Sequence, residues 1–175
     1  IAEGVTSDPA AAQRAAQIIH DETARLHRMV ESLLDLARLE ASRMDMRLGP
    51  VAPGDLLRAV GTGFSGRARE RQIDLRLIVP QTLPPVSGDG DRLAQVFTNL
   101  LDNALKHTPP GGTVTLSASL SDGGIVVTVR DTGEGIPPDE IGRIFERFYQ
   151  VDKSRRRDHQ SGLGLGLAIA RQIVE

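Results

Sequence analysis

Residues 89–107, DGDRLAQVFTNLLDNALKH, carry the strongest helix signal in the chain. The large apolar residues of this stretch recur at helical spacing and form one face: Leu93, Val96, Phe97, Leu100, Leu101 and Leu105. Asn99, Asn103 and Lys106 stand at i, i+4 and i+7, so they share another face of the same helix. The sequence therefore predicts a central packed helix with two amides and a lysine beside its packing surface.

Helices and strands alternate on both sides of this helix. They are separated by Gly, Pro and polar turn residues, and the turn Ser121-Asp122-Gly123-Gly124 joins two β-rich runs as a hairpin. The expected elements are a helix at 55–70, strands at 73–79, 113–120 and 125–130, a short helix near 138–145 and a last helix from about Leu163. This order predicts an α/β (α+β) fold, organised as a two-layer α/β sandwich.

The first third of the chain is expected to form one long helix. Asp8-Pro9 supplies an N-cap and a proline at the first helical position, and no Gly or Pro follows before Gly49. Residues recur every seven positions in two series, Ile19, Leu26, Leu33 and Thr23, Val30, Ala37, Met44. A helix of about 40 residues would be roughly 60 Å long, too long to be buried on so small a domain. We expect it to pair with another helix; an amphipathic helix packed on its own domain is the alternative.

Composition excludes several classes of protein. The 175 residues are 39% hydrophobic and 25% charged, the balance of an ordinary globular domain. A net charge of −2 and an aromatic content of 3% argue against nucleic-acid binding. Cysteine is absent, which excludes disulfides, thiolate metal sites and thiol catalysis. No apolar run approaches the roughly 20 residues that a membrane helix needs.

The polar face of the 89–107 helix fits a metal–phosphate complex. Mg²⁺ takes few protein ligands and keeps phosphate oxygens and waters, so amide oxygens from Asn99 and Asn103 with the ammonium of Lys106 suit Mg²⁺ bound to a triphosphate. The alternative is a helix whose polar groups only face solvent at its end.

The stretch Asp131-Thr-Gly133-Glu-Gly135-Ile136-Pro137 follows a predicted strand directly. Its two glycines let the backbone approach a ligand closely. A carboxylate at the end of a strand can accept a hydrogen bond from an exocyclic amine, which would favour adenine over guanine. A tight turn without a ligand could use the same Gly-x-Gly pattern.

A polar segment, 150–160, is bounded by two further motifs. Phe145 and Phe148 precede it at i, i+3 spacing and either anchor one of its ends or pack in the core. The segment carries four lysines and arginines and reads as a lid over charged phosphates or as a solvated charge run. Ser161-Gly162-Leu-Gly164-Leu-Gly166 then leads into a helix whose N-terminal N–H groups can hold phosphate oxygens.

In this order, these features resemble the N, G1, F and G2 boxes of bacterial two-component sensor histidine kinases. The family's ATP-binding fold is a mixed sheet backed by helices, shared with gyrase, mismatch-repair ATPases and a heat-shock chaperone. The resemblance implies ATP and Mg²⁺ as cofactors, with Asn103 as the metal ligand and Asn99 and Lys106 as catalytic residues near the phosphates. It implies adenine recognition by Asp131. The other implied nucleotide-binding positions are Gly133, Gly135, Ile136, Phe148, Tyr149, Gly162, Leu163, Gly164, Leu165 and Gly166.

The resemblance extends to the long helix, where residues 33–40, LLDLARLE, look like the end of the second helix of the family's dimerisation hairpin. It implies a partial dimerisation and histidine-phosphotransfer helix at 1–48 and an ATP-binding catalytic domain at 49–175, with the C-terminal strands missing. The phosphoacceptor motif, a histidine followed by Glu or Asp and then Leu-Arg-Thr-Pro or similar, is absent. His20 precedes Asp21-Glu22 without the proline and is expected on the helix surface.

Gln150 is a second departure from the family, which often carries a basic residue there.

The implied function is transfer of the γ-phosphate of ATP to a histidine outside this sequence, and then to an aspartate of a response regulator, by a homodimer. The implied location is cytoplasmic, with any attachment to the inner membrane made by other parts of the parent protein. An ATP-hydrolysing or nucleotide-sensing module is the alternative. Hydrolases of this fold place a glutamate base where Asn99 stands, and an amide cannot act as a base, which favours the kinase.

Overall fold

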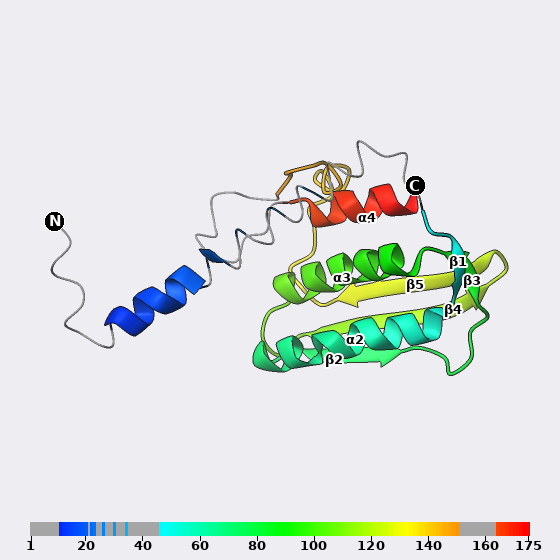
Figure 1. Ribbon diagram of the computed structural model, residues 1–175, viewed down its shortest axis with the longest axis horizontal. Coiled ribbons are helices and arrows are strands. Elements are labelled where there is room, and N and C mark those ends of the chain that lie inside the picture. The colour runs from blue at the N-terminus through cyan, green and yellow to red at the C-terminus, as the bar shows by residue number, and fades with distance from the viewer. Residues whose placement is uncertain are drawn as a thin grey trace.

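The computed structural model describes residues 11–20, 22, 23, 26, 30, 34, 46–150 and 164–175. Helices and strands alternate along the chain, as the sequence predicts (Figure 1). The elements are β1 (Gly49–Val51), α2 (Pro53–Glu70), β2 (Asp74–Ile78), β3 (Val86–Gly88), α3 (Gly90–His107), β4 (Thr113–Ser121), β5 (Gly124–Asp131) and α4 (Gly166–Val174).

The strands form a mixed three-stranded sheet and a small separate ladder. In the three-stranded sheet the order is β2-β4-β5, with β2 parallel to β4 and β4 antiparallel to β5. Strands β1 and β3 pair antiparallel with each other, which brings the segment before α2 next to the start of α3. The predicted mixed α/β architecture is therefore confirmed.

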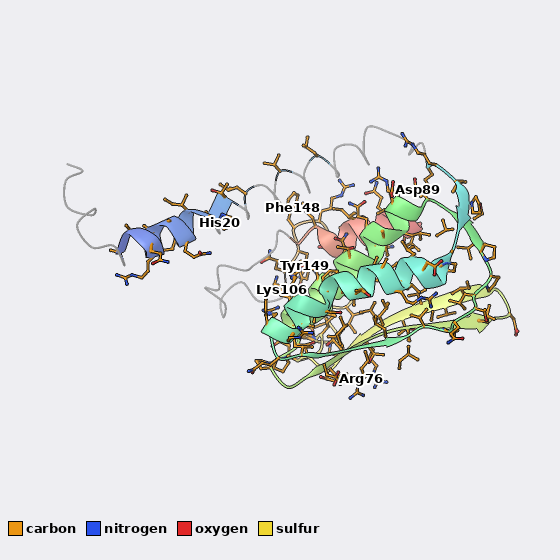
Figure 2. All side chains as sticks on the ribbon, turned by 60° about the horizontal axis from the view of Figure 1, so that its bottom comes forward. His20, Arg76, Asp89, Lys106, Phe148 and Tyr149 are labelled. Carbon is orange, nitrogen blue, oxygen red and sulfur yellow. The ribbon has the colours of Figure 1, made fainter. Side chains whose placement is uncertain are left out.

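Helices α2 and α3 lie on the same side of the sheet, and Figure 2 shows Arg76 on the opposite side. The core between the helices and the sheet contains Leu57, Phe64, Ala68, Ile73, Leu101, Ala104, Leu105, Val114, Leu116 and Ala118. Helix α4 packs on α3 through a second cluster of buried residues, Val96, Leu165, Ile169, Ala170 and Ile173. Helix α3 is therefore packed between the sheet and α4.

Both ends of α3 are fixed by side chains that the local sequence supplies. At its start, Asp89 Oδ1 accepts hydrogen bonds from the backbone N–H groups of Asp91 and Arg92, at 3.1 and 3.2 Å. Its Oδ2 accepts from Arg47 N at 3.0 Å, which ties the residues before β1 to the same cap. At the other end, the buried Thr108 donates through Oγ1 to Ala104 O at 2.7 Å. These bonds satisfy backbone groups that a helix leaves open at its ends.

The expected elements were incomplete in one respect and wrong in another. Strands β1 and β3 were not predicted, because three residues are too few to show an alternating pattern. The short helix expected near 138–145 is wrong: this segment forms a series of turns. Its bonds from Arg143 N to Glu140 O and from Glu146 N to Arg143 O, both 2.8 Å, span three residues, and a single bond, from Ile144 N to Glu140 O at 3.2 Å, spans four. Two prolines at its start and Gly142 inside it disfavour a continuous helix.

The N-terminal helix is confirmed over residues 11–20, and the other described positions up to 34 are also helical. Figure 1 shows residues 11–20 lying away from the sheet, and the side chains of Leu26, Val30 and Leu34 are exposed. The predicted end at about Leu48 is wrong, because 46–48 are not helical. The predicted N-cap Asp8-Pro9 lies outside the described residues. No helix in the described part of the chain is both long enough and apolar enough to span a membrane.

Replacing Asp89 with Ala should lower the midpoint of thermal unfolding, because the cap loses its three backbone hydrogen bonds. The N–H groups of Arg92 and Arg47 hold the pKa of Asp89 below its ordinary value. The stabilisation is therefore fully present above the ordinary aspartate range and is lost as the pH falls through the lowered pKa. Thermal unfolding of both proteins at neutral pH and in acid should show a difference that shrinks in acid. Asp122→Ala, which removes an exposed turn carboxylate, should show no comparable difference at either pH.

Two glycines inside α2 give a matched test of how this helix packs. An added Cβ at Gly63 would meet nothing within 4 Å, so Gly63→Ala should raise the free energy of unfolding by about 0.5–1 kcal/mol through helix propensity. At the buried Gly61 an added Cβ would overlap the δ-carbons of Leu77 on β2. Gly61→Ala should lose most or all of that gain in denaturant unfolding. Equal stabilisation by both variants would contradict the packing of α2 on β2.

Candidate functional site

Three segments meet at one end of the domain. Figure 1 shows that α3 ends, β5 ends and α4 begins at this end. In Figure 2, Lys106, Phe148 and Tyr149 lie at this end, whereas Asp89 lies at the opposite end of α3. The predicted site residues on the central helix, the Asp131 loop and the last glycine loop are thus brought to the same region.

Asp131 is the last residue of β5 and lies on the helix-facing side of the sheet. Its register partner on β4 is Val114, whose side chain is fully buried, and residues opposite one another in a ladder share a face. The Asp131 carboxylate is exposed, and its Oδ1 accepts a hydrogen bond from Gly133 N at 2.8 Å. This bond orients the carboxylate, which retains acceptor capacity for a donor on a ligand.

The loop after Asp131 is packed against the end of α3. A Cβ at Gly133 would lie 2.5 Å from the carbonyl oxygen of His107, so only glycine fits there. Glu134 Oε1 lies 3.6 Å from His107 Nδ1. Gly135 has a φ of +74° and open space around its Cα, so its glycine is required by the backbone conformation rather than by packing. Ile136, which follows, is 42% exposed.

The three polar residues of α3 are placed differently. Asn99 Nδ2 donates to the backbone carbonyl oxygen of Gly166, the first residue of α4, at 3.1 Å. Asn103 and Lys106 are half-buried on the following turns, toward the end of the helix where the Asp131 loop packs. The predicted shared face is therefore confirmed, and one of its members contacts α4.

The start of α4 has no side-chain cap. Leu165 occupies the N-cap position without a side-chain hydrogen bond, and its own side chain is 2% exposed. The N–H groups of the first turn are therefore available to an anion, and the helix dipole favours negative charge there. The predicted positions Gly162 and Leu163 lie outside the described residues.

The segment between Phe148 and Gly164 is joined at its two ends. Phe148 N donates to Gly164 O at 3.1 Å. Both residues have a positive φ, +62° for Phe148 and +71° for Gly164. Next to Phe148, the guanidinium of Arg143 lies 4.2 Å from the centre of the Tyr149 ring, a cation–π contact. The alternative of core packing is wrong for Phe148, whose side chain is 52% exposed.

Some residues at this end were not identified from the sequence. Thr132 accepts through Oγ1 from Thr113 N at 2.9 Å and fixes the Asp131 loop to the start of β4. The sequence feature that could have identified Thr132 is its position between Asp131 and Gly133. The acceptor of Asn99, by contrast, is a backbone atom 67 residues away, and no sequence pattern indicates it.

Two of the four histidines, His20 and His107, lie among the described residues. His20 lies on the exposed surface of the N-terminal helix, as predicted (Figure 2). His107 is the last residue of α3 and lies beside the Asp131 loop. His27 and His159 are outside the described residues.

Comparisons with known proteins place this geometry in a family. Residues 88–175 match the family model described as histidine kinase-, DNA gyrase B- and HSP90-like ATPase. The chain is 37% identical over 163 residues to hybrid signal transduction histidine kinase D of Dictyostelium discoideum, covering 90% of this chain and 10% of that protein. It is 34% identical over 178 residues to the sensor protein SrrB of Staphylococcus aureus, covering 100% of this chain and 30% of that protein. The chain thus spans less than a third of the length of these relatives.

Solved structures agree with the sequence relatives. Full-length ShkA in complex with AMPPNP superposes with a TM-score of 0.78 at 37% identity, over 97% of this chain and 34% of that chain. The histidine kinase ThkA in complex with the response regulator protein TrrA gives a TM-score of 0.73 at 26% identity, over 97% of this chain and 46% of that chain. The family model, which covers half of the sequence, and these neighbours confirm the predicted resemblance. The chain belongs to the histidine kinase-, DNA gyrase B- and HSP90-like ATPase family, and the relatives and solved structures to which it is similar are histidine kinases and sensor proteins.

Proposed function

We propose that this chain is the ATP-binding catalytic region of a sensor histidine kinase, with a partial dimerisation helix at 1–48 and the catalytic domain at 49–175. The observation that carries the proposal is the meeting of the Asp131 loop, the end of α3 and the uncapped start of α4 at one end of the domain. A nucleotide pocket needs a hydrogen-bond acceptor for the adenine amine on one side and hydrogen-bond donors for the phosphate oxygens on the other. These segments would supply both.

In this proposal Asp131 reads the adenine. Its carboxylate accepts from the exocyclic amine, while its other bond, from Gly133 N, holds it in place. Gly135, Ile136 and Tyr149 lie along the same end of the domain and would border the nucleotide. The solved complex of ShkA contains AMPPNP, an ATP analogue, which supports the same class of ligand here.

The phosphates would lie at the start of α4, against the N–H groups of residues 164–168 and the ammonium of Lys106. The side-chain oxygen of Asn103 fits a Mg²⁺ ligand, because it is a neutral oxygen donor, half-buried on the face of α3 that leads to α4. Bound Mg²⁺ would neutralise phosphate charge as the γ-phosphoryl group is transferred. Gly162 and Leu163 belong to the same proposed loop.

Phosphoryl transfer is favoured over hydrolysis by the residue at position 99. An amide cannot accept a proton as a general base, and the Nδ2 of Asn99 is occupied by Gly166 O. A neutral imidazole nitrogen is nucleophilic without such a base. The P–N bond would form as the bond to the leaving β-phosphate oxygen breaks, and ADP departs. The acceptor histidine is proposed to lie on a helix outside this sequence, because His20 lacks the family's following motif.

The partners follow from the same reading. The exposed apolar side chains of Leu26, Val30 and Leu34 would be covered in a homodimeric helical bundle. ThkA, a structural neighbour, is seen with a response regulator, which supports a receiver-domain aspartate as the next phosphate acceptor. We propose a cytoplasmic location, with any membrane anchor in other parts of the protein.

Titration with ATP, ADP and GTP, with and without Mg²⁺, tests the proposed nucleotide site. ATP and ADP should bind and GTP should bind at least tenfold more weakly, because the carboxylate of Asp131 would accept from the 6-amino group of adenine, where guanine carries a carbonyl oxygen. Asp131→Asn should reduce ATP affinity by roughly tenfold or more, since the loss of a hydrogen bond to a charged group costs about 1.5–3 kcal/mol. Asp139→Asn, an exposed carboxylate in the turns beyond the loop, is the control. Equal binding of ATP and GTP would contradict the role of Asp131.

Substituting the glycines of the last loop tests the proposed phosphate end. Gly164→Ala should weaken ATP binding and lower stability, since its φ of +71° disfavours a side chain and the new Cβ would overlap Tyr149 O. Gly166→Ala meets only ordinary contacts, with Asn99 Cβ and Cγ at 3.7 Å, so the folded domain should keep its stability. Gly166→Ala is therefore the control and should keep its ATP affinity, because the new Cβ contacts Asn99 and the backbone N–H groups remain. Unchanged ATP affinity in Gly164→Ala would place the phosphates elsewhere.

A further inference from the structure

The interface between α3 and α4 contains a cluster of apolar residues with Asn99 beside it. On α3, Val96, Phe97 and Leu100 pack against α4. On α4 the packing residues are Leu165, Ile169, Ala170 and Ile173. Asn99 falls between these apolar positions on the helix, half-buried, where an unpaired amide would be costly.

The amide of Asn99 is paired with α4 rather than left for solvent. Its Nδ2 donates to Gly166 O at 3.1 Å. Its Cβ, Cγ and Oδ1 lie 3.7, 3.7 and 3.8 Å from the point where a Cβ of residue 166 would be. The whole side chain of Asn99 therefore packs against the first residue of α4. Because an asparagine side chain is short, it has little freedom to contact groups beyond that residue.

An apolar interface alone does not fix how a short helix sits along its neighbour. Hydrophobic contact is non-directional, and α4 has only nine residues. A hydrogen bond with defined distance and angle fixes both the height and the rotation of α4 at the point where it begins. The nearby bond from Phe148 N to Gly164 O links the start of α4 to residue 148 and not to α3, and Leu165 provides no side-chain cap.

We propose that Asn99 is a positioning residue that sets the place of the first turn of α4, and not a group that contacts the metal or the phosphates. This inference rests on the proposed function, because the position of the first turn of α4 matters only if the N–H groups of 164–168 bind a nucleotide. Asn103 and Lys106, one and two turns further along α3, keep the direct contacts. Asn99 then serves the reaction through backbone geometry.

The test uses hydrogen–deuterium exchange of the nucleotide-free protein. In Asn99→Leu the apolar packing is kept and the hydrogen bond is lost; in Asn99→Asp the shape is kept and the donor is lost. Exchange of the amides of residues 169–172, the first ones in α4 that bond within the helix, should be roughly three- to tenfold faster in both variants, the effect of one net hydrogen bond. Asn99→Gln, which retains the donor, should restore part of the protection. Thr98→Leu, an exposed neighbour on α3, is the control and should exchange as the parent does.

Ligand binding provides the second readout. Both variants that lose the donor should weaken ATP more than adenosine, because adenosine lacks the phosphates that α4 holds. Parental exchange rates at 169–172 together with a loss of ATP affinity would overturn the inference and make Asn99 a direct ligand contact. If exchange is faster in the variants but the parent protein binds no ATP, the positioning role is upheld and the proposed function is overturned.

Discussion

Helix α3 is packed on two sides, and the arrangement of the domain depends on that packing. Leu101, Ala104 and Leu105 face the sheet, and Val96 and Leu100 face α4, while Phe97 contacts both clusters. Each side removes apolar surface from water, and neither neighbour of α3 would have a complete core without it. The helix is therefore the common reference against which the sheet and α4 are both placed.

The candidate site is built mainly from the ends of elements around α3. The Asp131 loop packs on its last residue through Gly133, and α4 is fixed to its middle through Asn99. Backbone groups at such ends are not paired within their own element, so they are free to bind the oxygens and amines of a ligand. The opposite end of α3 is closed by Asp89, whose carboxylate also binds Arg47 N. Residues just before the domain are thereby linked to the helix that carries the site.

Elements with a periodic pattern of apolar residues or with local turn residues could be predicted from the sequence. The face formed by Asn99, Asn103 and Lys106, the hairpin of β4 and β5, and the Asp131 loop were all anticipated, because each depends on local spacing. The short strands β1 and β3 were not, since their pairing depends on residues nearly 40 positions apart. The turns at 138–145 read as a helix because Ile141, Ile144 and Phe145 imitate helical spacing, while Gly142 and the preceding prolines prevent it. The bond from Asn99 to Gly166 is set by tertiary packing alone.

The central claim is that three separate segments form one nucleotide site, and the most direct measurement is residue-resolved hydrogen exchange with and without a non-hydrolysable ATP analogue and Mg²⁺. The account predicts that protection increases together, and with the same ligand concentration dependence, at 131–135, at the last turn of α3 and at 165–168. Protection confined to one of these segments, or none at saturating ligand, would contradict it.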